Sequence, residues 1–208
     1  MGIEREAVLG LLLAGGQGRR MGGVDKPLQT MDGRPLLGHS IERLRPQVGT
    51  LVINANGDPV RFAQFGLPVV ADGVGGFAGP LAGILAGLEW AAEHAPACGW
   101  LASFATDAPF VPTDLVARLA AAVDTQGADI GCAMSGGRTH PVFGLWPVRL
   151  AAELRRALVD EDIRKIDRWS ARYRVAYAEW PAAPLDPFFN VNTAEELSQA
   201  ERLSGQQA

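Results

Sequence analysis

The sequence contains few cysteines, no long apolar run and no excess of basic residues. Its two cysteines, Cys98 and Cys132, stand far apart in apolar, strand-like runs, which favours buried free thiols over a disulfide or a metal site. No apolar run approaches the ~20 residues that a membrane-spanning helix needs. The formal net charge of −4 argues weakly against a nucleic-acid surface, because no basic stripe balances the phosphates of a duplex. We therefore expect a protein that binds neither membranes nor nucleic acids.

Residues 1–6 offer no signal for export or lipidation. They contain neither the apolar core of a signal peptide nor the serine or threonine of a myristoylation site, so we expect a cytoplasmic protein. A length of 208 residues suits one substantial core and is short for two. We therefore expect a single domain over residues 1–208, with a frayed tail at about 204–208.

A stretch rich in glycine and arginine follows the first apolar run directly. The segment from Ala7 to Leu13 predicts a buried strand, and residues 14–26 then read AGGQGRRMGGVDK. Glycines let bare backbone N–H groups turn toward an anion, and arginines and a lysine follow them here. This order predicts a phosphate-binding loop just beyond the carboxyl end of a strand.

The loop matches neither of the common glycine motifs. A dinucleotide fingerprint needs a third glycine where Met21 stands, and a P-loop needs Lys-Ser or Lys-Thr where Val24-Asp25 stands. With its Leu-Ala-Gly-Gly opening and its complete Met-Gly-Gly-Val-Asp-Lys ending, the stretch instead resembles the signature of the molybdenum cofactor guanylyltransferases, a family of nucleotidyltransferases. The resemblance covers the chain from Leu13 to Thr193.

Two predicted strands end near polar side chains. The strand Thr50–Asn56 carries Asn54 close to its end, and the short strand Pro68–Ala71 is followed by Asp72. Because the carboxyl ends of parallel strands line the ligand crevice of an open sheet, we expect Asn54 and Asp72 to contact the nucleoside. The alternative is that both residues only begin turns, as Asn and Asp often do.

A second glycine-rich segment, Gly73–Gly79, is expected to be mobile over the pocket. It leads into a helix that begins at Pro80, a residue suited to a first turn, and runs to about His94. Gly83 and Gly87 lie inside this helix, which costs helix propensity but permits close packing on a sheet or a ligand. The junction, Gly-Pro-Leu-Ala-Gly, also resembles a string that borders the guanine site in the guanylyltransferase family.

Asp107 is the best-placed metal ligand in the sequence. It stands at the carboxyl tip of the apolar strand Trp100–Ala105 and is followed two residues later by Pro109. Mg²⁺ prefers one or two carboxylates together with phosphate oxygens and water, so one such Asp suffices. In the resembling family the Asp of this Asp-x-Pro tripeptide holds the catalytic magnesium. A capping role for Asp107 is the alternative, although Thr113 offers a better cap for the predicted helix Asp114–Val123.

A pair of asparagines precedes the last predicted helix. Asn190 and Asn192 alternate about Val191, so both amides face one side of an extended segment. Thr193 and Glu196 then have the spacing of a capping box. The segment resembles the Asn-Val-Asn-Thr string that the family associates with its active centre and pterin substrate. The alternative is that both asparagines are turn residues.

The remaining segments complete an alternating pattern of strands and helices. Strands are predicted at Asp129–Met134, Pro141–Trp146 and Tyr173–Ala178, and helices at Leu150–Leu158 and Ile163–Trp169. The step His-Pro before the second of these strands resembles a family feature near the acceptor, but a single His at a strand start is more often structural, so we assign it no chemical role. About seven strands alternating with helices predict a three-layer α/β/α, Rossmann-like nucleotidyltransferase fold with a mostly parallel central sheet.

The resemblance implies transfer of GMP from GTP to the terminal phosphate of molybdopterin, which gives the guanine dinucleotide cofactor and pyrophosphate. It implies Mg²⁺ on Asp107, with Mn²⁺ as a substitute, while Arg20 and Lys26 stabilise the departing pyrophosphate. An extra arginine in the loop means that Arg19 and Arg20 could exchange roles. The resemblance places GTP on Leu13, Ala14, Gly15, Gly16, Lys26, Asn54, Asp72, Gly79, Pro80 and Asp107, and the acceptor on Asn190 and Asn192.

Two other functions stay open at this level. The first is a related nucleotidyl transfer that uses CTP or a sugar-phosphate acceptor, although the Leu-Ala-Gly-Gly opening is similar to the guanine-specific form. The second is a nucleotide-binding module without turnover, which would not require Asp107 and Lys26 together. The resemblance also implies transient contacts with other cofactor-biosynthesis proteins and with recipient molybdoenzymes.

Overall fold

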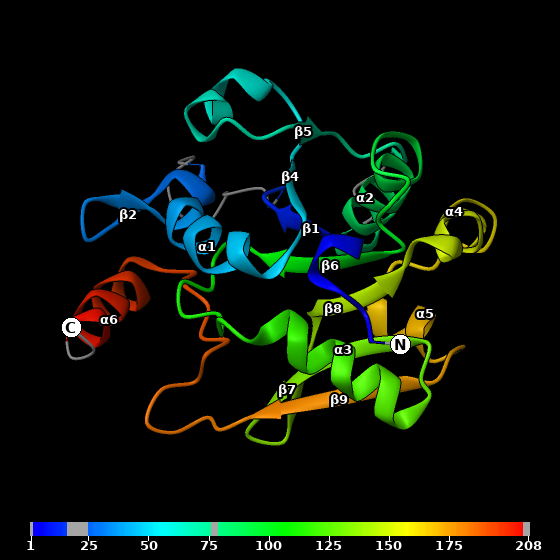
Figure 1. Ribbon diagram of the computed structural model, residues 1–208. Coiled ribbons are helices and arrows are strands. Elements are labelled where there is room, and N and C mark those ends of the chain that lie inside the picture. The colour runs from blue at the N-terminus through cyan, green and yellow to red at the C-terminus, as the bar shows by residue number, and fades with distance from the viewer. Residues whose placement is uncertain (1, 16–24, 76–78, 206–208) are drawn as a thin grey trace.

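The computed structural model describes residues 2–15, 25–75 and 79–205 (Figure 1). Three predicted loop residues, Gly16, Arg19 and Arg20, lie outside these ranges, as does part of the segment Gly73–Gly79 that was expected to be mobile. Short 3-10 helices connect several larger elements in the described ranges: η1 (Arg5–Ala7), η2 (Lys26–Leu28), η3 (Arg45–Gln47), η4 (Pro59–Phe65) and η5 (Val148–Leu150).

A seven-stranded sheet forms the centre of the described chain. Its strands, in their order across the sheet, are β5 (Val69–Val70), β4 (Thr50–Asn54), β1 (Val8–Leu13), β6 (Trp100–Ala105), β8 (Arg138–Pro147), β7 (Ile130–Ser135) and β9 (Val175–Trp180). Neighbouring strands are parallel except at β8, which runs antiparallel to both β6 and β7. The predicted mostly parallel sheet is confirmed.

Strand β1 shows why helices cover both faces of this sheet. Val8 and Leu12 point into one hydrophobic core, whereas Leu9 and Leu11 point into a second core on the opposite face, and all four are fully buried. A strand that is apolar on both faces is stable only between two layers. The first core packs against α1 (Leu36–Leu44) and α3 (Leu115–Gln126), and the second against α2 (Pro80–His94), α4 (Ala151–Val159) and α5 (Ile166–Ser170). The predicted three layers are confirmed.

A small third core lies beside the main sheet, where the last helix meets an early hairpin. Helix α6 (Ala194–Ser204) contacts the two-stranded hairpin β2 (Thr30–Met31) and β3 (Arg34–Pro35) (Figure 1). The predicted capping box is present, because Thr193 Oγ1 accepts from the Glu196 amide at 3.1 Å and Glu196 Oε2 accepts from the Thr193 amide at 3.0 Å. The packing of α6 fixes the asparagine segment that precedes it.

Two glycines let helix α2 lie unusually close to the sheet. A Cβ added to Gly83 would lie 2.3 Å from Asn54 Oδ1, and one added to Gly87 would lie 2.6 Å from the Leu101 side chain. Real Cβ atoms do not approach other atoms so closely, so a larger residue would displace either the helix or the side chain beneath it. The predicted close packing at both glycines is confirmed, and it brings the start of α2 to the carboxyl ends of β1 and β4.

The pairing of β8 with β7 is interrupted next to the carboxyl end of β6. On one side of the interruption Cys132 of β7 pairs with Gly144, and on the other side Ala133 pairs with His140. One step along β7 therefore corresponds to four steps along β8, which leaves residues 141–143 without partners on β7. Such bulges re-aim side chains next to functional sites. Predicted as a strand from Pro141, β8 in fact begins at Arg138, because Gly136 and Gly137 alone make the turn.

The predicted cap of α3 is wrong. The residue that precedes this helix is Asp114 rather than Thr113, and its side chain makes no capping hydrogen bond. Instead Asp114 Oδ1 accepts from the Trp180 indole at 3.0 Å, and the Val116 amide in the first turn donates to Gln47 Oε1 at 2.9 Å. A distant side chain therefore satisfies the helix start, which local sequence could not indicate.

Both cysteines are buried free thiols, as predicted. Cys132 lies in β7, and burial raises the pKa of its thiol to about 11. Cys98 lies in the loop before β6 rather than in a strand-like run. No helix within residues 2–15, 25–75 and 79–205 is long and apolar enough to cross a membrane.

Candidate active site

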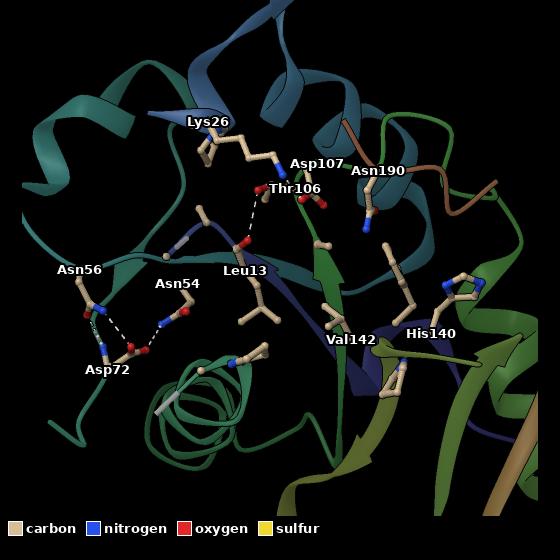
Figure 2. A pocket seen from close by; sticks show the side chains of 18 of the residues that line it. Leu13, Lys26, Asn54, Asn56, Asp72, Thr106, Asp107, His140, Val142 and Asn190 are labelled. Carbon is tan, nitrogen blue, oxygen red and sulfur yellow. Dashed lines mark hydrogen bonds and ion pairs between the residues drawn. The ribbon is translucent and has the colours of Figure 1, made fainter. Parts of the chain in front are cut away.

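A cavity of about 560 Å³ opens at the carboxyl ends of β1, β4 and β6 (Figure 2). Most of the predicted site residues line it: Leu13, Ala14, Gly15, Lys26, Asn54, Asp72, Gly79, Pro80, Asp107 and Asn190. The backbone connects these strand ends, because the Ala14 amide donates to the Asn54 carbonyl at 2.8 Å and Thr106 Oγ1 donates to the Leu13 carbonyl at 3.2 Å. Segments far apart in the sequence thus form one hydrogen-bonded surface at the base of the cavity.

The cavity also has lining residues that sequence analysis did not select: Pro27, Asn56, Ala105, Thr106, Thr139, His140, Pro141, Val142 and Phe143. Asn56 follows β4 two positions after Asn54, a spacing that offered a usable signal. Residues 139–143 lie at or next to the bulge of β8, and the sequence marked only their His140-Pro141 step, to which no chemical role was assigned. Figure 2 shows the labelled side chains in the order Asn56, Asp72 and Asn54, then Lys26 and Asp107, then Asn190 and His140.

At one end of the cavity, two asparagines hold a carboxylate. Asn54 Nδ2 donates to Asp72 Oδ1 at 2.9 Å, and Asn56 Nδ2 donates to Asp72 Oδ2 at 2.8 Å. The Asp72 amide donates back to Asn56 Oδ1 at 2.9 Å. Asn54 itself is 3% exposed, and the backbone of Gly83 in α2 packs closely against its side chain. The alternative of simple turn residues does not describe this network, which presents an ordered carboxylate to the cavity.

The start of α2 borders the same end. Gly79 precedes the helix with a φ of 67°, in the left-handed region that favours glycine, and Pro80 occupies the first turn. A helix N-terminus carries unpaired N–H groups and a partial positive charge, which favour an anionic ligand. Both residues line the cavity, so this positive end lies beside the Asp72 network.

Lys26 and Asp107 meet in the middle of the cavity. Lys26 Nζ donates to Asp107 Oδ2 at 2.5 Å and to Asn192 Oδ1 at 2.6 Å. The Val191 amide donates to the Asp107 carbonyl at 2.8 Å, which ties the asparagine segment to the tip of β6. Asn190 and Asn192 therefore differ in their contacts: Asn190 lines the cavity, whereas Asn192 Oδ1 accepts from Lys26.

The surroundings of Asp107 fit a hard divalent cation. Its second oxygen, Oδ1, is buried and has no hydrogen-bond partner among the described residues. Within those residues no group of three or more His, Cys, Asp or Glu side chains gathers around it or elsewhere. A cation that takes one carboxylate and completes its shell with phosphate oxygens and water needs no such group. Asp107 is thus suited to a metal that a phosphorylated substrate shares.

The far end of the cavity is formed by His140 and the bulge of β8. His140 is half-buried, its ring stacks on Phe188 with centroids 4.6 Å apart, and its Nε2 lies 2.7 Å from Ser135 Oγ. Burial lowers the pKa of His140, the nearby Asp186 carboxylate raises it by a smaller amount, and Arg138 lowers it further. The balance favours a neutral imidazole.

A helix N-terminus, a lysine and a half-buried carboxylate converge beyond parallel strand ends, and this arrangement is that of a nucleotide-binding α/β enzyme. A family model of the MobA-like NTP transferase domain matches residues 10–180 of the chain. The chain is 63% identical over 198 residues to a molybdenum cofactor guanylyltransferase of Bradyrhizobium sp. (strain ORS 278), covering 95% of this chain and 93% of that protein. The chain therefore belongs to the MobA-like nucleotidyltransferases, and within them to the molybdenum cofactor guanylyltransferase family.

Solved structures share the fold. The molybdopterin-guanine dinucleotide biosynthesis protein A of Archaeoglobus fulgidus is 27% identical with a TM-score of 0.71, and the match covers 95% of this chain and 99% of that one. A protein of Mycobacterium tuberculosis H37Rv, solved in complex with manganese, is 16% identical with a TM-score of 0.65, covering 94% and 98% of the two chains. The latter likeness concerns the fold alone.

Proposed function

We propose that this cavity carries out the transfer indicated by the family: GMP passes from GTP to the terminal phosphate of molybdopterin, giving molybdopterin guanine dinucleotide and pyrophosphate. Family membership supports the reaction. The observation that supports this cavity as its site is the pair of Lys26 and Asp107, which lies between an end with a fixed carboxylate and an end with an amide and an imidazole. A cavity with two such ends suits two substrates whose phosphate groups must come together beside Lys26 and Asp107.

The Asp72 end binds the guanosine part of GTP in this proposal. Guanine presents N1–H and N2–H₂ donors, which suit a carboxylate acceptor. Each Asp72 oxygen accepts one asparagine hydrogen bond and retains further lone-pair capacity for the ligand. The phosphates then lie along Gly15 and the start of α2, where bare N–H groups favour anions. The predicted contributions of Gly16 and Arg20 remain predictions.

The chemical step takes place beside Lys26 and Asp107. An oxygen of the acceptor phosphate forms a bond to the α-phosphorus of GTP, and the bond from that phosphorus to the bridging oxygen breaks, so that pyrophosphate leaves with the electron pair. The acceptor is already an anion and needs no strong base. Bound at Asp107, a divalent cation, Mg²⁺ in this proposal and Mn²⁺ as its substitute, supplies charge neutralisation. Lys26 places a further positive charge against the departing pyrophosphate.

The acceptor lies toward Asn190. The Asn190 amide lines the cavity beyond Asp107, while Asn192 holds the Lys26 ammonium in place through its Oδ1. Both asparagines thus support transfer, one by contact with the acceptor and one through the lysine. Contacts with other cofactor-biosynthesis proteins and with recipient molybdoenzymes remain predictions that the cavity does not address.

Product formation from each nucleoside triphosphate tests the proposal. Purified protein is incubated with molybdopterin, MgCl₂ and GTP, CTP, ATP or UTP in turn, and both dinucleotide and pyrophosphate are quantified. The account expects a product with GTP and a kcat/KM for CTP lower by about tenfold or more, because a missing partner inside a buried polar site costs about 1–3 kcal/mol. Equal kcat/KM for GTP and CTP would contradict the assigned base, and nucleotide binding without any product would favour a module without turnover.

A further inference from the structure

The bulge of β8 forms the wall at the far end of the cavity, and hydrogen bonds from buried side chains hold it in place. Residues 141–143 leave the β7 ladder, and the backbone of this bulge is held by side chains: Ser103 Oγ donates to the Val142 carbonyl at 2.6 Å, and the Trp146 indole donates to Ser103 Oγ at 2.8 Å. Ser103 is fully buried and Trp146 is 1% exposed. The wall is therefore fixed before any ligand arrives, and such preorganisation favours selective binding.

His140 is the last residue of β8 to pair with β7 before the bulge, and its imidazole is linked through Ser135 to Asp186. Ser135 Oγ lies 2.9 Å from Asp186 Oδ1 and 2.7 Å from His140 Nε2. A carboxylate oxygen only accepts, and the serine has one hydrogen to donate. That hydrogen must go to Asp186, since otherwise two lone pairs would face each other at 2.9 Å. Ser135 Oγ consequently accepts its second hydrogen bond from His140 Nε2–H.

The hydrogen bonds from His140 to Ser135 and from Ser135 to Asp186 fix the tautomer of the imidazole. With Nε2 protonated, the Nδ1 of a neutral His140 carries a lone pair, and this atom makes no hydrogen bond within the described part of the chain. Asp186 is itself held, because its Oδ1 also accepts from the Phe188 amide at 3.0 Å, and the Phe188 ring stacks on the imidazole. The ring therefore has a fixed plane, a fixed tautomer and one unused acceptor.

We propose that Nδ1 of His140 accepts a hydrogen bond from an N–H group on the ring system of the acceptor substrate, and that Ser135 and Asp186 are positioning residues that set the tautomer which makes this possible. The inference rests on the proposed function, which places the acceptor at this end. A phosphate suits this atom poorly, because its oxygens are acceptors and would face the lone pair of the neutral imidazole. An amino-substituted nitrogen heterocycle such as a pterin supplies the required donors.

Two substitutions separate this role from a structural one. Glutamine places its terminal amide near the position of Nε2, so His140→Gln keeps a donor for Ser135 but removes the acceptor in the cavity. Asparagine places its amide near the position of Nδ1, so His140→Asn keeps a cavity acceptor but loses the link to Ser135. The exposed residue His94 at the end of α2 gives a matched control, His94→Gln.

Initial rates with GTP or the acceptor varied in turn are measured for all variants. We expect His140→Gln to raise the acceptor KM by about tenfold, the usual effect of one lost hydrogen bond, while the GTP KM stays within about twofold. We expect His140→Asn to recover most of the acceptor affinity. The reverse order, with His140→Gln near normal and His140→Asn impaired, overturns the inference in favour of a structural role. A wild-type protein that makes no dinucleotide refutes the proposed function instead, which is a separate outcome.

Nitrogen NMR of the imidazoles tests the positioning residues without substrate. The chain has three histidines, so the signals of His140 are identified from those lost in His140→Gln. We expect the wild type to show protonated Nε2 and unprotonated Nδ1 at neutral pH, and Ser135→Ala and Asp186→Asn to show a mixture of tautomers with a raised acceptor KM. Protonated Nδ1 in the wild type, or an unchanged tautomer in both variants, overturns the assignment.

Discussion

At one end of the cavity, Asp72 is held by two asparagines at the tips of parallel strands; at the other, His140 is held by a serine and an aspartate behind a bulged antiparallel strand. The first end presents a carboxylate, an acceptor that suits the several N–H donors of guanine. The second presents a neutral imidazole with one lone pair. In the proposed function both ends recognise N–H groups on flat heterocycles, and Lys26 lies between them, where the phosphates of the two substrates would meet.

The largest expected effect comes from the group between the ends. Asp107→Asn keeps the shape and the hydrogen bond from Lys26 but removes the charge that would hold a cation. Transfer should fall by several orders of magnitude, since metal and positioning supply most of the catalysis in this reaction class. The melting temperature should change little. A purely capping role for Asp107 predicts the opposite, a stability loss of roughly 0.5–2 kcal/mol with turnover preserved.

A smaller effect is expected from Gly83→Ala, a substitution in α2 next to Asn54 at the nucleotide end of the cavity. In Gly83→Ala the new methyl group would lie 2.3 Å from Asn54 Oδ1, so Asn54 must move and its bond to Asp72 must weaken. We expect the GTP KM to rise by about tenfold while the acceptor KM stays unchanged, together with a stability loss of about 1–3 kcal/mol. Gly87→Ala is the matched control, because its methyl group meets Leu101 and Leu11 instead of Asn54. An equal GTP KM in both variants would remove Asn54 from the nucleotide site.

The smallest expected effect is a loss of stability at acid pH that arises from His140, at the acceptor end of the cavity. Burial lowers the pKa of His140 in the folded chain below its ordinary value of about 6.5, although Asp186 opposes this and Arg138 assists it. In the interval between the two pKa values the unfolded chain binds more protons, so stability falls as the pH drops through about 6.5. Relative to His140→Gln, the wild type should lose less than about 3 °C in melting temperature between pH 7.5 and 5.5. A relative gain over that range would show that the pKa is raised.

The two ends differ in how far the sequence predicts them. Asn54, Asp72 and Asp107 each stand at the end of an apolar run, and parallel strand ends share one edge, so local pattern is enough to bring them together. Asn56 was missed although it shares this signal. The His-Pro step marked His140 only through its resemblance to the family. The contacts of His140 with Ser135 and of Ser135 with Asp186 depend on the pairing of β7 with β8 and on a late loop, and neither has a local sequence signature.

The same limit applies to the details of the predicted site and of the helix that follows it. Asn190 and Asn192 were both predicted to bind the acceptor, and this stays a prediction. The contact of Asn192 with Lys26 was not predicted, because it depends on the Val191 amide, which donates to the Asp107 carbonyl and sets the path of the segment. The helix after Asp107 is capped by Gln47, a residue about seventy positions away. Contacts between distant segments decide such roles, and residue spacing does not encode them.

In the proposed function, one cavity has a nucleotide end and an acceptor end on either side of Asp107. The most direct test makes the same chemical change at both ends, Asn56→Ala and Asn190→Ala, and determines the KM for GTP and for molybdopterin in each. We expect Asn56→Ala to raise the GTP KM alone, because Asp72 loses a partner, and Asn190→Ala to raise the acceptor KM alone. If both variants raise the KM of the same substrate, the division of the cavity is wrong.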